Sequence, residues 1–377
     1  MKAPGSMMGG KILYLESLRG IAALTVALHH FRVNTPIADN TFVANGWLMV
    51  DFFFVLSGFV ISLNYQEEIR TFSDLATFQI KRLLRLYPLH FVMLLVFLVI
   101  ETAKYFVTTK MGLEADHAAF TANNVGSFLH NLVLTQSIFI DDTTWNGPSW
   151  SISAEFYTYI AFALLVLAFR RNYAAFLVAS SVMVLIGFIS IFKIGYTFDI
   201  VRCFYSFFIG VLVLNLANRT RMTVSPTAMA TIAGAIVVAL SVVEWSAFEP
   251  VTLMFPLLFG MLILSLVLSP AQGLLKRTLE DRRLVYLGTI SYGIYMVHTS
   301  VWWVINQVMK LGLHFPTIPA EEGGSLLVIR NQWLASVIAV AGLAIIICLA
   351  HLSYSLIEMP INRLRHKLGT SVAKSSD

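Results

Sequence analysis

The sequence predicts an all-α, polytopic membrane protein with about ten transmembrane helices. Of its 377 residues, 57% are hydrophobic and only 12% are charged, and the mean hydropathy is +0.75. A soluble domain carries roughly a quarter charged residues. Apolar runs of about 20 residues recur along the chain, and a run of that length can cross a bilayer as a helix. The net charge of +5 is typical of the basic cytoplasmic loops of such a protein and does not indicate a nucleic-acid partner.

The apolar runs give the expected order of the membrane spans. Each run is bounded by charged, Gly-rich or Pro-containing segments. The ten expected spans cover residues 13–32, 43–65, 87–108, 148–169, 173–192, 199–217, 226–245, 251–269, 284–309 and 331–356.

The segment "FSDLATFQIKRLLRLYP" between the second and third spans has a different pattern. Its apolar residues recur every three or four positions, and its basic residues share the opposite face. This pattern predicts an amphipathic helix that lies at the cytoplasmic membrane surface.

The basic residues also predict the orientation. With the N-terminus in the cytoplasm, the basic clusters fall on one side of the membrane, as is typical of cytoplasmic loops. These clusters are Lys81, Arg82 and Arg85; Arg170 and Arg171; Arg219 and Arg221; Lys276, Arg277, Arg282 and Arg283; and Arg363, Arg365 and Lys367. An even number of spans then places both termini in the cytoplasm, in a multi-pass protein of the cytoplasmic membrane.

The sequence gives no sign of a second domain. We expect one integral-membrane domain over residues 1–377, with spans from about 13 to 360 and a short basic cytoplasmic tail at 361–377. The first apolar run lacks a small-residue cleavage site, so we do not expect a signal peptide. The two cysteines, Cys203 and Cys348, lie in apolar runs and suggest neither a disulfide framework nor a metal site.

The first span carries an arginine and a histidine that an ordinary span avoids. Arg19 and His30 are eleven positions apart, which is about 1100° of helical rotation and about 16 Å of rise, so they share one face. Glu16 lies one turn before Arg19, whereas His29 is rotated by about 100°. One interpretation is a structural Glu16–Arg19 pair with His30 at the span boundary. The other is a functional face, because buried ionisable groups usually face a cavity and histidine can transfer a proton near neutral pH.

Two buried carboxylates support the functional interpretation. Asp51 opens the second span, and Glu155 lies among aromatic residues in the fourth. A lone carboxylate in hydrocarbon needs a partner or a proton. The candidate partners in the spans are Arg19, His30, Arg202 and His298.

Further polar side chains occur within the predicted spans. Such residues more often contribute to packing or to interface anchoring than to chemistry when they occur singly. We nevertheless include Ser57, Ser151, Tyr292 and His298 as supporting candidates.

The basic residues Arg82 and Arg85 are three positions apart and share a helix face. Two guanidinium groups in this arrangement suit phosphate groups. The alternative is that both arginines anchor the chain to lipid headgroups, and their position alone favours that alternative.

Five ordered segments together resemble acyltransferase family 3, a family of membrane-bound O-acyltransferases. They are "LESLRGIAALTVALHHF", "VDFFFVLSGFVI", "KRLLRLYP", "PSWSISAEFYTY" and "SYGIYMVH", and "IEMP" near the end is also similar. The first resembles the family pattern of an arginine, ten residues and a histidine, which here are Arg19 and His30. The second carries Val60 where leucine is commoner. The resemblance covers nearly the whole chain.

The resemblance implies transfer of an acyl group, most often acetyl, from cytoplasmic acyl-CoA to a hydroxyl of an extracytoplasmic carbohydrate. It implies His30 as the general base, since a hydroxyl becomes a good nucleophile only when a base accepts its proton. Arg19 would meet the thioester or a CoA phosphate, and Arg82 and Arg85 would hold CoA phosphates. Glu155 would orient or stabilise the His30 imidazole, as a carboxylate does in a triad.

Several other expectations accompany this interpretation. We expect no metal and no permanently bound cofactor, with acyl-CoA acting as a substrate. Some relatives carry a C-terminal esterase-like domain, which we do not expect here. The alternatives are a transporter or flippase that uses Arg19, Asp51 and Glu155 as a pathway, and an acyltransferase with a small-molecule acceptor. Inverted repeats would support transport, and the sequence shows none.

Overall fold

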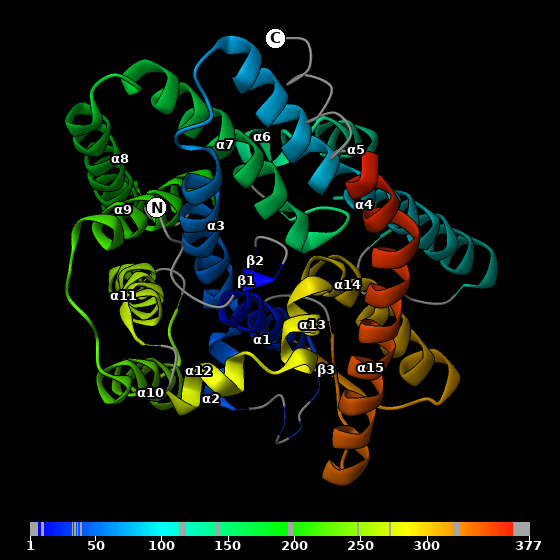
Figure 1. Cartoon of the computed structure of the whole chain (residues 1–377). Coiled ribbons are helices and arrows are strands. Elements are labelled where there is room, and N and C mark those ends of the chain that lie inside the picture. Colours follow the sequence, from blue (N-terminus) through cyan, green and yellow to red (C-terminus); the bar gives the residue numbers. More distant parts are fainter. Residues whose placement is uncertain are drawn as a thin grey trace.

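The protein is a bundle of α-helices, described here from a computed structural model (Figure 1). The structure describes residues 7–8, 11–31, 33, 35, 37, 40–112, 118–140, 143–194, 199–246, 249–270, 273–319 and 325–364. The helices are α1 (Leu13–His29), α2 (Thr41–Ala44), α3 (Met49–Tyr65), α4 (Phe72–Met111), α5 (Val125–Leu132), α6 (Gln136–Phe139), α7 (Trp150–Phe169), α8 (Tyr173–Ile194), α9 (Asp199–Arg219), α10 (Pro226–Val242), α11 (Met254–Leu268), α12 (Leu274–Leu279), α13 (Arg282–Thr289), α14 (Ser291–Gln307) and α15 (Gln332–Ser353).

Shorter elements connect or extend these helices. They are the 3₁₀ turns Asn45–Leu48, Gly147–Ser149 and Pro250–Leu253, the π-helical turns Val308–Gly312 and Tyr354–Glu358, and the strands β1 (Met7–Met8), β2 (Lys11–Ile12), β3 (Thr317–Pro319) and β4 (Ser325–Leu327). Each strand pair forms an antiparallel ladder, and Val33 bridges Leu327 of β4.

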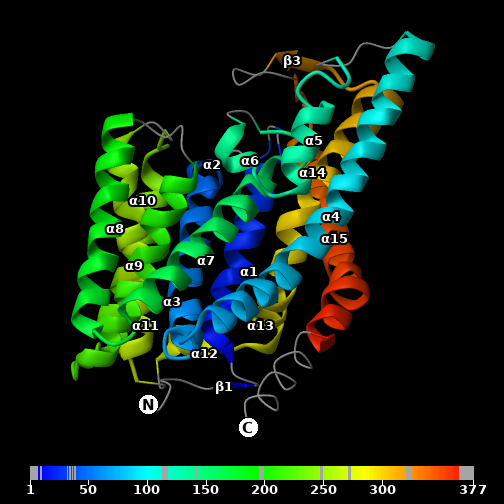
Figure 2. The same cartoon turned by 90° about the horizontal axis from the view of Figure 1, so that it is seen from above.

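The bundle has two distinct ends (Figure 2). The small helix α12 and strand β1 lie at one end, which we call the basic end because α12 carries Lys276 and Arg277 and the following helix α13 begins with Arg282 and Arg283. The helices α2, α5 and α6 and strand β3 lie at the other end, which we call the α5 end. The predicted orientation makes the basic end cytoplasmic.

All ten predicted spans contain helices, so the all-α polytopic fold is confirmed. Seven described helices are long and apolar enough to cross a membrane. The remaining three expected spans correspond to α1, α10 and α14, which have 17 residues each. In Figure 1, α1 lies near the centre, whereas α8 and α10 lie at the rim.

The amphipathic segment before the third span is helical, as the sequence predicts. It continues into the third span as the 40-residue helix α4, with Pro88 inside. A capping box between Thr71 and Asp74 begins the helix. Proline at an interior position kinks a helix instead of always ending it. In Figure 2 the first part of α4 lies obliquely, and its second part rises beside α14 and α15.

The expected span at 284–309 is also divided. The Asp281 side chain caps α13, which ends at Thr289, and α14 begins at Ser291. Next to this break in the span, α13 packs very closely against α1. A Cβ atom added at Gly288 would lie 1.9 Å from the Glu16 carbonyl oxygen. The position therefore requires glycine.

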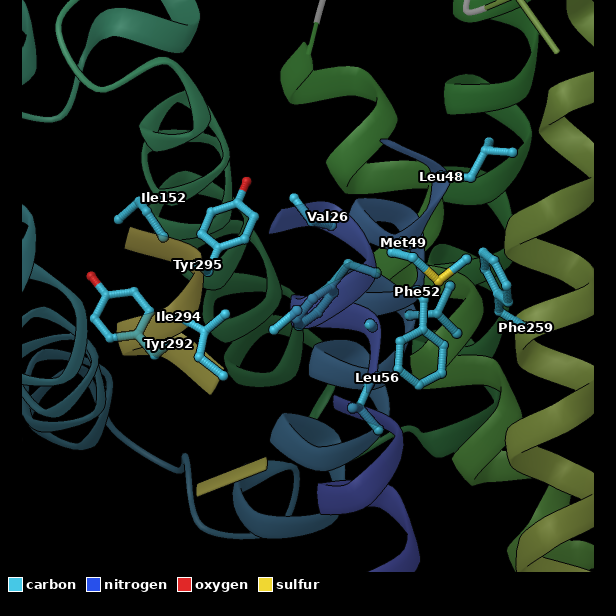
Figure 3. Close-up of a cluster of buried hydrophobic side chains, with 14 of the residues drawn as sticks. Val26, Leu48, Met49, Phe52, Leu56, Ile152, Phe259, Tyr292, Ile294 and Tyr295 are labelled. Atoms are coloured by element: carbon cyan, nitrogen blue, oxygen red, sulfur yellow. The ribbon is translucent and has the colours of Figure 1, made fainter. Parts of the chain in front are cut away.

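A continuous apolar core joins α1, α3, α7, α11 and α14 (Figure 3). Helices α3 and α9 also pack closely, at a pair of glycines. A Cβ at Gly58 would lie 1.9 Å from the Phe207 carbonyl oxygen, and a Cβ at Gly210 would lie 1.9 Å from the Val55 carbonyl oxygen. Small residues of this kind let helix backbones pack where lipid provides no hydrophobic driving force. The prediction of a cytoplasmic tail falls largely on residues 365–377, which lie outside the described residues.

Candidate functional site

Two histidines from distant parts of the chain meet in the bundle. His30 follows α1 and His298 lies on α14, and their ring centroids are 4.9 Å apart. The Nδ1 atom of His30 is 2.9 Å from the Val26 carbonyl oxygen, and that of His298 is 3.2 Å from the Ile294 carbonyl oxygen. A ring nitrogen facing a carbonyl must carry the proton. In each neutral ring, Nε2 therefore has the lone pair that can accept a proton.

The His298 ring is completely buried, and its Nε2 atom has no hydrogen-bond partner among the described residues. A buried polar atom without a partner is costly, so it is rare in native structures. The structure thus places an imidazole with spare accepting capacity beside His30. The sequence suggested His298 as a supporting residue but could not show that it contacts His30.

The neighbouring His29 is held differently. Its ring meets that of His30 edge-on at 5.1 Å, and its Nδ1 atom is 3.1 Å from the Val43 carbonyl oxygen of α2. The two adjacent histidines therefore face different elements, as the helical rotation between them predicts.

Glu155 lies in a separate polar cluster with Ser57 and Tyr159. Its Oε1 atom accepts hydrogen bonds from the Ser57 hydroxyl at 2.6 Å and the Tyr159 hydroxyl at 2.5 Å. The two hydroxyl oxygens are 2.9 Å apart. The structure thus brings together two of the predicted site residues, Glu155 and Ser57, but it joins Glu155 to Tyr159 rather than to His30.

Asp51 is paired with Arg202 of α9. The guanidinium donates from two nitrogens to the two carboxylate oxygens, with Nε 2.6 Å from Oδ1. Ser206 adds a longer contact of 3.4 Å, and the guanidinium lies over the Trp47 ring at 4.7 Å. Arg202 was one of the four partners that the sequence suggested. This bidentate pair, in which the Asp51 side chain is fully buried and the Arg202 side chain is 12% exposed, links α3 to α9.

Arg19 and Glu16 form an ion pair at the basic end of α1, with 3.0 Å between Arg19 Nη1 and Glu16 Oε1. The Arg19 side chain retains 24% of its exposure. This contact matches the structural pair that the sequence offered as one interpretation of the first span. Arg19 lies in the second turn of α1 and His30 directly follows the helix, so the two lie toward opposite ends of α1.

The two arginines of α4 have different surroundings. Arg85 pairs with Glu358 at 3.2 Å, beyond α15. Arg82 instead donates from Nη2 to the Tyr65 hydroxyl at 2.9 Å and lies over the rings of Tyr65 and Phe78. Although they share a helix face, only Arg85 has a described carboxylate partner.

Two hydroxyl contacts connect neighbouring helices to α14, one from Ser151 on α7 and one from Tyr292 of α14 to α4. The Ser151 hydroxyl is 2.8 Å from that of Tyr295, and Ser151 also donates to the Pro148 carbonyl oxygen at 2.9 Å. The Tyr292 hydroxyl donates to the Leu86 carbonyl oxygen on α4. Tyr292 and Tyr295 also line the core shown in Figure 3.

Asn146 is a site-adjacent residue that the sequence reasoning missed. Its amide nitrogen donates to the Met296 carbonyl oxygen at 3.0 Å, and its amide oxygen accepts from the Thr299 hydroxyl at 2.7 Å. Asn146 therefore contacts α14 at positions before and after His298. The Asn-Gly pair before the fourth span was a signal for a turn, but no local pattern pointed to α14. Among the described residues, no group of three or more His, Cys, Asp or Glu side chains could hold a metal ion.

Comparison with known proteins identifies the family. The model of the acyltransferase family 3 domain matches residues 12–353. The chain belongs to this acyltransferase family. No solved structure matches.

Two curated proteins are similar to the chain. It is 26% identical over 379 aligned residues to peptidoglycan O-acetyltransferase OatA of Listeria monocytogenes, an alignment covering 93% of the chain and 55% of OatA. It is 31% identical over 160 residues to acyltransferase MdmB of Streptomyces mycarofaciens, covering 40% of the chain and 38% of MdmB. The chain therefore spans about half or less of the length of these relatives.

Proposed function

We propose that the protein is an O-acyltransferase that moves an acyl group, most simply acetyl, from acyl-CoA to a hydroxyl of a carbohydrate acceptor. The observation that carries the proposal is the His30–His298 pair in a member of the acyltransferase family. The similarity to a peptidoglycan O-acetyltransferase supports both the acetyl group and the carbohydrate acceptor. The predicted orientation has acyl-CoA entering from the basic end.

In this proposal the acceptor hydroxyl loses its proton to Nε2 of His30 while its oxygen attacks the thioester carbonyl. A new C–O ester bond forms, the C–S bond breaks, and CoA leaves as the thiolate, which takes up a proton. His298 lies close enough to stabilise the imidazolium that His30 becomes. Because Nδ1 of His30 donates to the Val26 carbonyl oxygen, the lone pair of the neutral ring is on Nε2, the atom that we propose accepts the proton.

The Glu155 cluster has a supporting role in this proposal. The hydroxyls of Ser57 and Tyr159 hold the carboxylate in a fixed position inside the bundle. A fixed negative charge there can stabilise a nearby positive charge that develops during transfer. Arg19, at the basic end of α1, would meet the donor before it reaches His30.

The protein in liposomes of defined lipid composition tests the proposal. Acetyl-CoA labelled in the acetyl group is supplied on one side and a soluble peptidoglycan fragment on either side, and label in an ester on the acceptor is measured. We expect ester label that depends on both substrates. Movement of acetyl-CoA or of the glycan across the bilayer without ester formation would instead favour a transporter.

A further inference from the structure

Two buried polar atoms on the first part of α4 have no hydrogen-bond partner among the described residues. They are Oε1 of Gln79 and Nε of Arg82. The other polar atoms used by the same side chains are well placed: Nε2 of Gln79 donates to the Phe156 carbonyl oxygen at 3.1 Å, and Nη2 of Arg82 donates to the Tyr65 hydroxyl. One acceptor, Oε1 of Gln79, and one donor, Nε of Arg82, thus remain without a described hydrogen-bond partner.

The two atoms form a pair because of helical spacing. Gln79 and Arg82 are three residues apart, so their side chains leave α4 on the same face. The orientation of the Gln79 amide is fixed by the Phe156 carbonyl, which requires a donor and so places Oε1 on the other side. Leaving either atom buried without a partner costs free energy, so each calls for a specific partner.

The pair lies beside the Glu155 cluster. Phe156, which fixes Gln79, follows Glu155 in the chain. The Phe78 ring contacts the Tyr159 ring at 6.0 Å, and the Arg82 guanidinium lies 5.8 Å from the centre of the same Phe78 ring. The unpartnered acceptor and donor therefore belong to side chains whose neighbours also contact the Glu155 cluster.

We propose that Gln79 and Arg82 bind the pantetheine arm of acyl-CoA, with Oε1 of Gln79 accepting an amide N–H and Nε of Arg82 donating to an amide carbonyl. This inference rests on the proposed function and names the part of the donor that this site recognises. The pantetheine arm is a neutral chain that carries two secondary amides, each with one donor and one acceptor. It therefore matches a site that offers one hydrogen-bond acceptor and one donor.

Other parts of the donor fit the pair poorly. A phosphate group has only acceptor oxygens, so it would leave the Gln79 oxygen without a partner. A hydrocarbon acyl chain would leave both atoms without partners. Arg85, which shares the face, is already paired with Glu358. The two arginines that look equivalent in the sequence thus differ, and Arg82 with Gln79 provides the amide-binding positions.

The test compares two glutamines with the same local chemistry. Gln136 also donates from Nε2 to a backbone carbonyl, that of Ser149 at 3.1 Å, and its Oε1 atom is also buried without a partner. It lies at the α5 end instead of near the basic end. Gln79→Met and Gln136→Met remove the same groups, so the second is a matched control for the first.

The measurements are the KM for acetyl-CoA and the Ki of pantetheine as a competitor of acetyl transfer, with the full chain in liposomes. We expect Gln79→Met to raise both constants by about three- to tenfold, the effect of one hydrogen bond, with little change in kcat. We expect Gln136→Met to leave both constants unchanged. The thermal unfolding midpoint of each variant checks the fold, and Gln79→Ala replaces Gln79→Met if the latter does not fold.

The outcomes separate this inference from the proposed function. If the unmodified protein transfers acetyl groups but Gln79→Met keeps the parental constants, the pantetheine site is wrong and the proposed function stands. A rise in KM for acetyl-CoA without a rise in the Ki of pantetheine would show that Gln79 acts on a part of acetyl-CoA other than the pantetheine arm, and would overturn the inference. Equal rises in both variants would indicate a general structural effect and also overturn it. An unmodified protein that forms no ester contradicts the proposed function itself.

Discussion

The Asp51–Arg202 pair and the His30–His298 pair each join a fully buried residue to a partly buried one, yet their hydrogen bonding differs. Both carboxylate oxygens of Asp51 are bonded to guanidinium nitrogens, and Ser206 and Trp47 complete the surroundings. In the histidine pair, each Nδ1 atom is satisfied by its own helix, while Nε2 of His298 has no partner among the described residues.

The difference distinguishes structure from function. A buried charge that is completely paired serves to hold helices together, since no capacity is left for a substrate. A buried polar atom without a partner costs stability, and a ligand or a reaction that needs the atom is one reason for it to persist. We therefore propose that the Asp51 cluster is structural, and that the histidine pair and the Gln79–Arg82 pair are functional. Four predictions test this division.

The largest expected effect is on the reaction. Replacing His30 with alanine removes the proposed base and should lower the rate of acetyl transfer by about 10²- to 10⁴-fold. The unfolding midpoint should change little, because the side chain is only half-buried. The rate is measured as ester formation in liposomes. His29→Ala is the matched control. Equal losses of transfer rate in the two variants would contradict the assignment of His30 as the general base.

The next effect is on stability. Asp51→Asn leaves the Arg202 guanidinium buried without its counter-charge, which should cost about 3–5 kcal/mol of unfolding free energy. Denaturant unfolding in detergent measures this loss. Replacing both Asp51 and Arg202 by leucine should recover most of it, because the pair is then absent as a whole. A single variant as stable as the parent would show that the pair is not structural.

His298 should have a smaller effect on the rate than His30, since we propose that it stabilises the imidazolium without touching the acceptor. His298→Phe keeps a buried ring but removes both nitrogens. The rate should fall by about 10- to 100-fold, as for one hydrogen bond to a charged group. His298→Gln, which keeps a hydrogen-bonding group, should recover part of that loss. Wild-type kcat in the Phe variant would make His298 a packing residue.

The smallest expected effect is on the pH dependence of stability, and it arises from Lys276, which lies at the basic end outside the spans and donates a hydrogen bond to the Ser269 carbonyl oxygen. Burial lowers the pKa of the Lys276 ammonium, and Glu280 opposes the shift. The folded protein therefore releases this proton at a lower pH than the unfolded chain, whose lysine titrates near 10.5. The unfolded state binds more protons in that range, so stability should rise with pH up to about 10.5.

Lys276→Met should remove the contribution of Lys276 to the rise of stability with pH, whereas Lys81→Met, at a partly exposed position, should keep that contribution. The unfolding midpoint in detergent, followed from pH 8 to pH 10, measures the difference between the two variants at each pH. Identical pH dependence in the parent and Lys276→Met would contradict the assignment.

Local features could be predicted from the sequence because they depend on helical geometry alone. The apolar runs located helices in all ten expected spans, and a separation of three residues predicted the Glu16–Arg19 pair. The rotation of 100° per residue separated His29 from His30. The ordered segments also indicated the family that residues 12–353 match.

The contacts between distant helices were decided by the tertiary structure. The sequence does not distinguish among the four candidate partners of Asp51, two arginines and two histidines, whereas the packing of α3 on α9 brings Arg202 to Asp51. His298 lies 268 positions after His30, so no local period relates them. The different surroundings of Arg82 and Arg85 depend on Tyr65 and Glu358, which reach α4 from other helices. Helical periodicity fixes which side chains share a face, but packing alone fixes what that face meets.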